Sequence, residues 1–133
     1  MKKINIKQKV IFNTSPNNIY ELLMDSKKHS SFTGDIAKIS RKIGGKFIAY
    51  SGYIEGKNLK LIKDKKIVQL WRRSDWPKDH YSTVIFHIKS KKGKTELIFT
   101  QKNIPTKTIM KDISKGWKNY YWEPMKVFIK VNS

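Results

Sequence analysis

The stretch RRSDWPKDHYSTV, residues 72–84, contains the residue types that most resemble a chemical site in this chain. A carboxylate and a histidine, Asp79 and His80, follow Trp76 and Pro77 in one short loop. Such a loop could carry acid–base chemistry or a metal ion, or it could be a folding corner or a docking surface. A zinc site needs three or four ligands held together, and adjacent side chains of an extended chain point apart. We therefore expect no metal site, and we expect His80 to be a hydrogen-bonded corner residue at the start of a strand.

The rest of the chain offers little for other enzyme chemistry. It has no cysteine, which excludes thiol nucleophiles and disulfides, and no serine lies in a Gly-x-Ser-x-Gly sequence. Its ten acidic residues are spread along the chain, with no pair suited to acid–base hydrolysis. Gly44-Gly45 is not followed by a phosphate-binding pattern. We predict that the protein is not an enzyme and uses no cofactor.

Aromatic side chains give a stronger signal, because they gather around the corner and near the C-terminus. Trp117 and Tyr121 fit the apolar stripe of a C-terminal helix, whereas Tyr120 and Trp122 fall off it. Exposed aromatic residues beside basic ones are typical contacts with a protein partner. We predict a partner-binding face formed by Arg72, Arg73, Trp76, Lys78, His80, Lys118, Tyr120 and Trp122.

The elements that would position these residues follow from hydrophobic periodicity. Alternation predicts a strand over residues 4–12, and two short helices follow, the first near residues 16–23 and the second ending near Gly34. Residues 36–105 are predicted to form a meander of strands, with turns at Gly44-Gly45, Glu55-Gly56, Asp64 and SKKGKT. Apolar residues at three- and four-residue spacing predict a helix over 107–131, which Pro124 should kink near Tyr120.

These elements predict one α+β domain over residues 1–133, with a curved antiparallel sheet wrapped around the long C-terminal helix. A gap between sheet and helix could hold a small apolar ligand. The chain has no run of about eighteen apolar residues and no signal peptide pattern, so we expect a cytoplasmic protein without a membrane span, and a monomer. The residues that would line the gap are Phe47, Trp71, Phe86, Trp117, Tyr121 and Met125.

The net charge of +19 predicts attraction to nucleic acid, to an anionic membrane or to an acidic face of a protein. Nucleic acid is the less favoured partner, because only three of the 29 basic residues are arginine and the lysines form no single stripe along the sequence. Stacking on single strands also prefers aromatic residues along a sheet face, whereas here they lie in a corner and a helix. Much of the lysine surface is expected simply to be solvated.

Several motifs resemble the activator of heat shock protein 90 ATPase family, specifically its C-terminal domain, over residues 15–130. They are Gly-Lys-Phe at 45–47, a glycine turn at Gly56, Trp71-Arg72, Trp-Pro-x-x-His at 76–80, Thr-Glu-Leu at 95–97, Ile-Pro at 104–105, and Gly-Trp-x-x-Tyr-Tyr-x-Glu-x-x-Lys at 116–126. The resemblance implies the helix-grip fold of START-like domains. It also implies a single-domain form, because the family's N-terminal domain, which binds the chaperone's middle segment, has no counterpart in this sequence.

The leading functional hypothesis is therefore a co-chaperone-like domain that binds heat shock protein 90 (Hsp90) and modulates its ATPase cycle. The resemblance implies contact with the chaperone's N-terminal ATPase domains in their closed, dimerised state. The alternative is a START-like protein that binds a small hydrophobic ligand. We further expect the corner at 72–84 and the motif at 116–126 to meet in space, with Trp76 or His80 packed near the start of the last helix.

Overall fold

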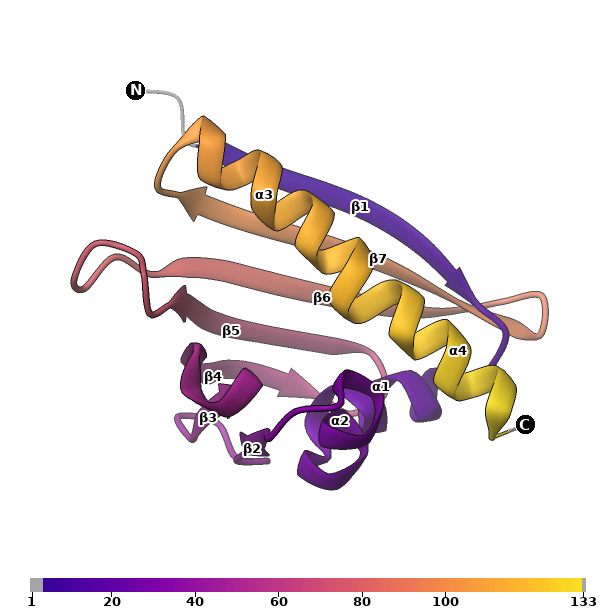
Figure 1. The fold of residues 1–133 in the computed structure, drawn as a ribbon. Helices are drawn as coiled ribbons and strands as arrows, with labels where there is room; N and C mark the ends of the chain where they lie inside the picture. Colours follow the sequence, from indigo (N-terminus) through magenta and orange to yellow (C-terminus); the bar gives the residue numbers. More distant parts are fainter. Residues whose placement is uncertain (1–3, 133) are drawn as a thin grey trace.

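A seven-stranded antiparallel sheet curves around a long C-terminal helix in the computed structural model, which describes residues 4–132 (Figure 1). The strand order is β1-β7-β6-β5-β4-β3-β2, and this arrangement confirms the predicted α+β helix-grip fold. The elements are β1 (Ile4–Phe12), α1 (Pro16–Met24), α2 (Ser26–Thr33), β2 (Lys38–Ile39), β3 (Lys46–Ala49), η1 (Tyr50–Gly52), β4 (Ile54–Ile62), β5 (Lys66–Arg73), β6 (Ser82–Lys91), β7 (Lys94–Ile104), α3 (Lys107–Trp117), η2 (Lys118–Trp122) and α4 (Glu123–Val131).

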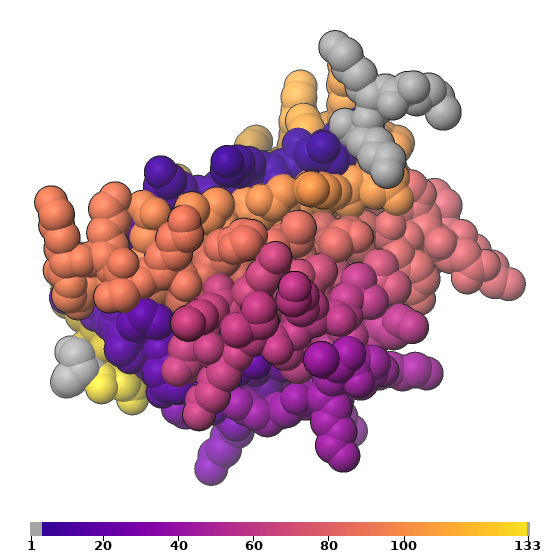
Figure 2. Space-filling model, turned by 180° about the vertical axis from the view of Figure 1, so that it is seen from behind, coloured from indigo at the N-terminus to yellow at the C-terminus, as the bar shows by residue number. Residues whose placement is uncertain are grey.

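One face of the sheet is buried against this helix. The helix does not cover the other face. In β6, for example, Val84, Phe86 and Ile88 are buried, while the alternate residues are half-buried. Figure 2 shows the opposite face, where strand side chains form the surface and the C-terminal helix does not lie over them. No helix within residues 4–132 is long and apolar enough to cross a membrane.

The C-terminal helix begins at Thr106, whose hydroxyl accepts a hydrogen bond from the Ile109 amide at 3.1 Å. Pro124 has no N–H for the carbonyl of Tyr120, four residues earlier. Residues Lys118–Trp122 form a wider π-helical turn here, and the Tyr50 hydroxyl donates to the Tyr120 carbonyl at 2.8 Å. The helix is therefore irregular near Tyr120, where we predicted a kink, and the irregularity is a π-turn.

The predicted turn at Glu55-Gly56 is wrong. The chain turns earlier, at η1, where Tyr50 and Ser51 have φ of 51° and 57°. Gly56 lies inside β4, and a Cβ atom there would be 1.8 Å from the Leu70 carbonyl oxygen. Glycine is therefore required at this position for the close approach of two strands.

Buried hydrogen bonds fix the orientation of the helix tryptophans. The Trp117 indole donates to Gln101 Oε1 at 2.7 Å, and the Gln101 amide donates to Ser82 Oγ at 2.9 Å. The Trp122 indole donates to Gln8 Oε1 of β1 at 2.7 Å. Since a buried N–H without a partner is costly, these amides select one rotamer for each indole.

Candidate functional site

A pocket of about 590 Å³ lies between the C-terminal helix and the β4–β5 side of the sheet. Buried rings of Trp71, Trp117 and Tyr121 contribute to its lining, together with three further tyrosines, two isoleucines, a glycine, an asparagine and four charged residues. This volume is within the usual range for ligand pockets. The full lining is Asp35, Tyr50, Tyr53, Ile54, Trp71, Arg73, Asp112, Ile113, Lys115, Gly116, Trp117, Asn119, Tyr120 and Tyr121.

Two unusual backbone segments form the walls of this pocket. Tyr50 belongs to η1, where it and Ser51 adopt the left-handed conformation, and Tyr120 belongs to the π-turn. The Ser51 hydroxyl donates to the Asp35 carboxylate, which lowers the pKa of that carboxyl. Left-handed non-glycine residues and π-turns are concentrated at functional sites, so their meeting at one pocket marks it as a candidate site.

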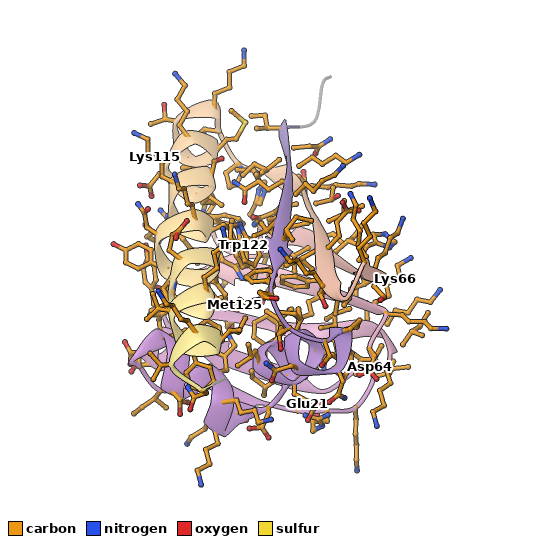
Figure 3. The ribbon with its side chains drawn as sticks, turned by 90° about the vertical axis from the view of Figure 1, so that its right-hand side faces the viewer. Glu21, Asp64, Lys66, Lys115, Trp122 and Met125 are labelled. Carbon is orange, nitrogen blue, oxygen red and sulfur yellow. The ribbon has the colours of Figure 1, made fainter. Side chains whose placement is uncertain are left out.

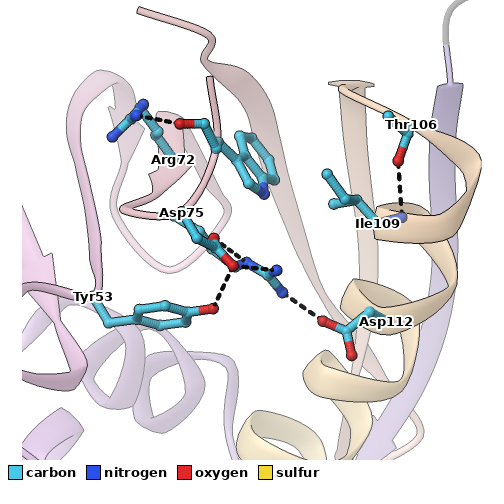
Figure 4. A network of polar contacts seen from close by, with 8 residues as sticks. Tyr53, Arg72, Asp75, Thr106, Ile109 and Asp112 are labelled. Atoms are coloured by element: carbon cyan, nitrogen blue, oxygen red, sulfur yellow. Dashed lines mark hydrogen bonds and ion pairs between the residues drawn. The ribbon is translucent and has the colours of Figure 1, made fainter. Parts of the chain in front are cut away.

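Arg73 joins the corner of residues 72–84 to the C-terminal helix, because it pairs with both Asp75 and Asp112, which are labelled in Figure 4. Its guanidinium bonds Asp112 Oδ2 of α3 at 2.7 Å and Asp75 Oδ2 at 2.9 Å, and it lies 5.6 Å from the centroid of the Tyr53 ring. Burial lowers the pKa of Arg73, but the bonds from both carboxylates outweigh it and the net pKa is raised. The same ion pair lowers the pKa of Asp75. Arg73 is thus occupied in holding the fold together.

Contacts among its own residues and with Trp71 hold the corner together. Arg72 Nη2 donates to the Trp76 carbonyl at 2.6 Å, and Trp76 is only 4% exposed because its ring packs 5.4 Å from that of Trp71. The expectation that Trp76 is an exposed partner contact is therefore wrong. His80 Nε2 donates to the Asn103 carbonyl at 2.8 Å, which confirms its predicted role as a hydrogen-bonded corner residue.

Trp122 is also buried, at 3% exposure, so its predicted exposure is wrong. Its ring stacks on Trp117 with centroids 5.4 Å apart, and in Figure 3 it points towards the sheet, as Met125 does, while Lys115 points away. The π-turn explains the error, because a wider turn allows the adjacent Tyr121 and Trp122 both to face the sheet. Tyr120, in contrast, is 61% exposed at the pocket.

Comparison with known proteins agrees with this geometry. A model of the family described as "Activator of Hsp90 ATPase homolog 1-like protein" matches residues 13–130. The chain belongs to this family. It is 32% identical to human "activator of 90 kDa heat shock protein ATPase homolog 1" over 93% of this chain and 36% of the relative. It is 34% identical to the Dictyostelium discoideum homologue over 85% of this chain and 30% of that protein. The chain thus spans about a third of the length of these curated relatives.

Solved structures extend the likeness. An HSP90 activator from Plasmodium falciparum has a TM-score of 0.90 at 26% identity, with 96% of both chains covered. CalU16 from Micromonospora echinospora has a TM-score of 0.81 at 16% identity, covering 96% of this chain and 76% of that one. The second likeness shows the fold alone.

In this member of the Hsp90 activator family, the residues of the predicted face separate into groups. Arg73 and Tyr120 line the same pocket, and Lys118 is exposed at the start of η2 outside the lining. Arg72, Lys78 and His80 lie on the corner. The corner meets the last helix through the Arg73–Asp112 ion pair rather than through the expected Trp76 or His80, whose contacts are with Trp71 and with Asn103.

Sequence reasoning missed Tyr50, Tyr53 and Asp112 as parts of the site. The tyrosines were assigned to a continuous strand, and the signal that could have placed them was Ser51-Gly52, a break within that run. Asp112 gave no signal, because its importance depends on a partner 39 positions away in the sequence.

The gap that we expected between sheet and helix is open on one side only, where Trp71, Trp117 and Tyr121 line the 590 Å³ pocket. Deeper in the core, these three residues with Phe47 and Phe86 border a cavity of only about 20 Å³, enough for about one water molecule, and Met125 is fully buried. His29 borders this small cavity, and its Nδ1 atom is buried without a hydrogen-bond partner among the described residues. Burial lowers the pKa of His29 to about 4. Within residues 4–132 no three histidine or acidic side chains are grouped to hold a metal ion.

Proposed function

We propose that this protein is a non-enzymatic, cytoplasmic co-chaperone-like module that binds Hsp90 and modulates its ATPase cycle. Membership of the activator family over residues 13–130 supports the proposal, and so does the likeness to an HSP90 activator of known structure across nearly the whole chain. Relatives of this name are considerably longer than this chain, so activation of the ATPase is part of the proposal.

The observation that carries the proposed binding site is the position of Tyr120. The π-turn holds this large ring outwards, with 61% of its surface exposed, at a pocket to which five other aromatic residues contribute. Tyrosine in such a place is a frequent hot spot of protein interfaces. We infer a face centred on Tyr120 and Lys118, extended by Arg72, Lys78 and His80 of the corner. Trp76 and Trp122 stabilise this face from the interior.

The mechanism would be a population shift. A protein accelerates hydrolysis by the chaperone only if it binds the closed, dimerised state more tightly than the open state. The net charge of +19 would speed association with an acidic surface and would make binding weaken with salt.

The experiment is calorimetric titration of this protein into Hsp90 from the same organism at low ionic strength. We expect binding that is at least fivefold tighter with a non-hydrolysable ATP analogue than without nucleotide. Absence of binding in both states would overturn the proposal. Equal affinity with and without the ATP analogue would show that the protein binds Hsp90 but does not shift it towards the closed state, and would overturn the proposed mechanism.

A small apolar ligand is the second candidate, because the 590 Å³ pocket has a suitable volume and an aromatic floor. Native mass spectrometry of freshly purified protein separates the two. A co-purifying molecule that leaves when Gly116→Phe narrows the pocket supports this role, whereas protein of the bare mass, with no shift on exposure to apolar compounds, rejects it.

A further inference from the structure

Four lysines form a stripe along the outer side of the C-terminal helix. Lys107, Lys111, Lys115 and Lys118 recur at spacings of four, four and three residues, which places them on one side of a helix. All four are exposed, and none forms an ion pair within residues 4–132. Lys115 also lines the 590 Å³ pocket, which we call the tyrosine pocket after Tyr50, Tyr53, Tyr120 and Tyr121 in its lining, so the stripe runs directly to it.

This stripe opposes the stability of the helix that carries it. Like charges four residues apart repel each other, and Lys107 places a cation in the first turn, where a helix favours anions. No acidic residue occupies that first turn to compensate. A partner of opposite charge lying along the helix would offset all of these repulsions at once.

The pocket beside the stripe can receive an apolar side chain. Gly116 has no side chain to fill the space at the pocket wall. A Cβ atom there would contact only the Tyr120 ring, at 3.8 Å. Trp71, Trp117 and Tyr121 provide an aromatic floor. Both carboxylates at the lining already have partners, since Asp35 accepts a hydrogen bond from Ser51 and Asp112 is paired with Arg73.

We propose that the lysine stripe and the tyrosine pocket form one docking site for an acidic segment of a protein partner. Carboxylates of the segment lie along Lys107, Lys111, Lys115 and Lys118, and one large apolar side chain enters the pocket. The inference deepens the proposed function and rests on it for the partner's identity, because it specifies the chemistry of the chaperone segment that this family member would bind.

The test uses ¹⁵N chemical-shift titration with synthetic probes: an acidic peptide with one phenylalanine, the same peptide with alanine instead, and a single-stranded oligonucleotide. We expect the phenylalanine peptide to shift the amides of Gly116 and Tyr120 and to bind at least fivefold more tightly than the alanine peptide. Equal affinity of the two peptides, or tighter binding of the oligonucleotide at the same amides, overturns the proposal.

Matched charge variants locate the site. Replacing Lys107, Lys111 and Lys115 by Gln should weaken binding of the phenylalanine peptide at least fivefold. The same change at Lys57, Lys60 and Lys63, which are exposed on and beside β4, removes equal charge and should weaken it less than twofold. Equal losses in the two triple variants would show a general charge effect and overturn the site.

The chaperone titration keeps this inference separate from the proposed function. If Hsp90 binds and the stripe variant binds it as well as the β4 variant does, the docking site is wrong and the function stands. If the peptide result holds and Hsp90 does not bind, the proposed function is wrong, and the docking site belongs to another acidic partner.

Discussion

Protonation of His29 should make the protein lose stability on mild acidification. The imidazole is 4% exposed, packs against the rings of Phe32 and Tyr121, and has a pKa lowered to about 4 by burial. The unfolded chain takes up this proton near the ordinary histidine pKa of 6.5, so between these two pH values the unfolded state binds more protons. Stability from neutral His29 is therefore complete above pH 6.5 and falls as the pH drops towards 4.

The magnitude follows from the gap between the two pKa values. At about 1.4 kcal/mol per pH unit, acidification from about pH 7.5 to 4.5 should lower the free energy of unfolding by roughly 2 to 3 kcal/mol. That is a large part of the total for a domain of this size, which is typically about 5–15 kcal/mol.

Urea denaturation of the wild type and of His29→Leu across this pH range measures the effect. Leucine removes the titrating group and its unpaired Nδ1 atom, so the variant should lose at least 2 kcal/mol less than the wild type by about pH 4.5. His87, whose pKa is also lowered, remains in both proteins and cancels in the comparison. Parallel pH profiles for the two proteins would refute the reasoning.

Three further predictions test the supports of the site. Gln101→Leu leaves the buried indole N–H of Trp117 without its acceptor and should cost about 2 kcal/mol in urea denaturation; a loss under 0.5 kcal/mol contradicts this. In a double-mutant cycle, Tyr50→Phe should cost about 1 kcal/mol less in the Pro124→Ala background, where the new amide can bond the freed carbonyl, and additive losses would reject that link. Lys111→Gln should raise the free energy of unfolding by about 0.4–1 kcal/mol, because it removes two like-charge pairs, whereas no change would mean that the stripe carries no strain.

Much of the fold could be predicted because its periodicities are local. The three- and four-residue spacing of Ile113, Trp117 and Tyr121 predicted the last helix, and alternation in the strands predicted which residues face it. Pro124 located the disturbance of the helix, since a missing amide acts on a carbonyl at a fixed distance along the chain.

The exposure of the site residues could not be predicted in the same way. Trp122 was placed with a regular helical period, and the π-turn changed that period by an amount that sequence spacing does not contain. Trp76 was predicted to be a partner contact because basic residues lie near it in the sequence, but the corner folds its ring back onto Trp71. Gly56 resembled a turn residue, and only the position of the neighbouring strand reveals that it is required for close approach.

The central claim is that this chain binds the closed state of Hsp90 through the tyrosine pocket. The most direct measurement compares the affinity of Tyr120→Ala for Hsp90, with a non-hydrolysable ATP analogue present, with that of Val127→Ala, which changes an equally exposed residue of α4. We predict that Tyr120→Ala binds at least tenfold more weakly, about 1.4 kcal/mol, while Val127→Ala binds like the wild type. Equal affinity of the two variants, both folded by circular dichroism, would contradict the claim.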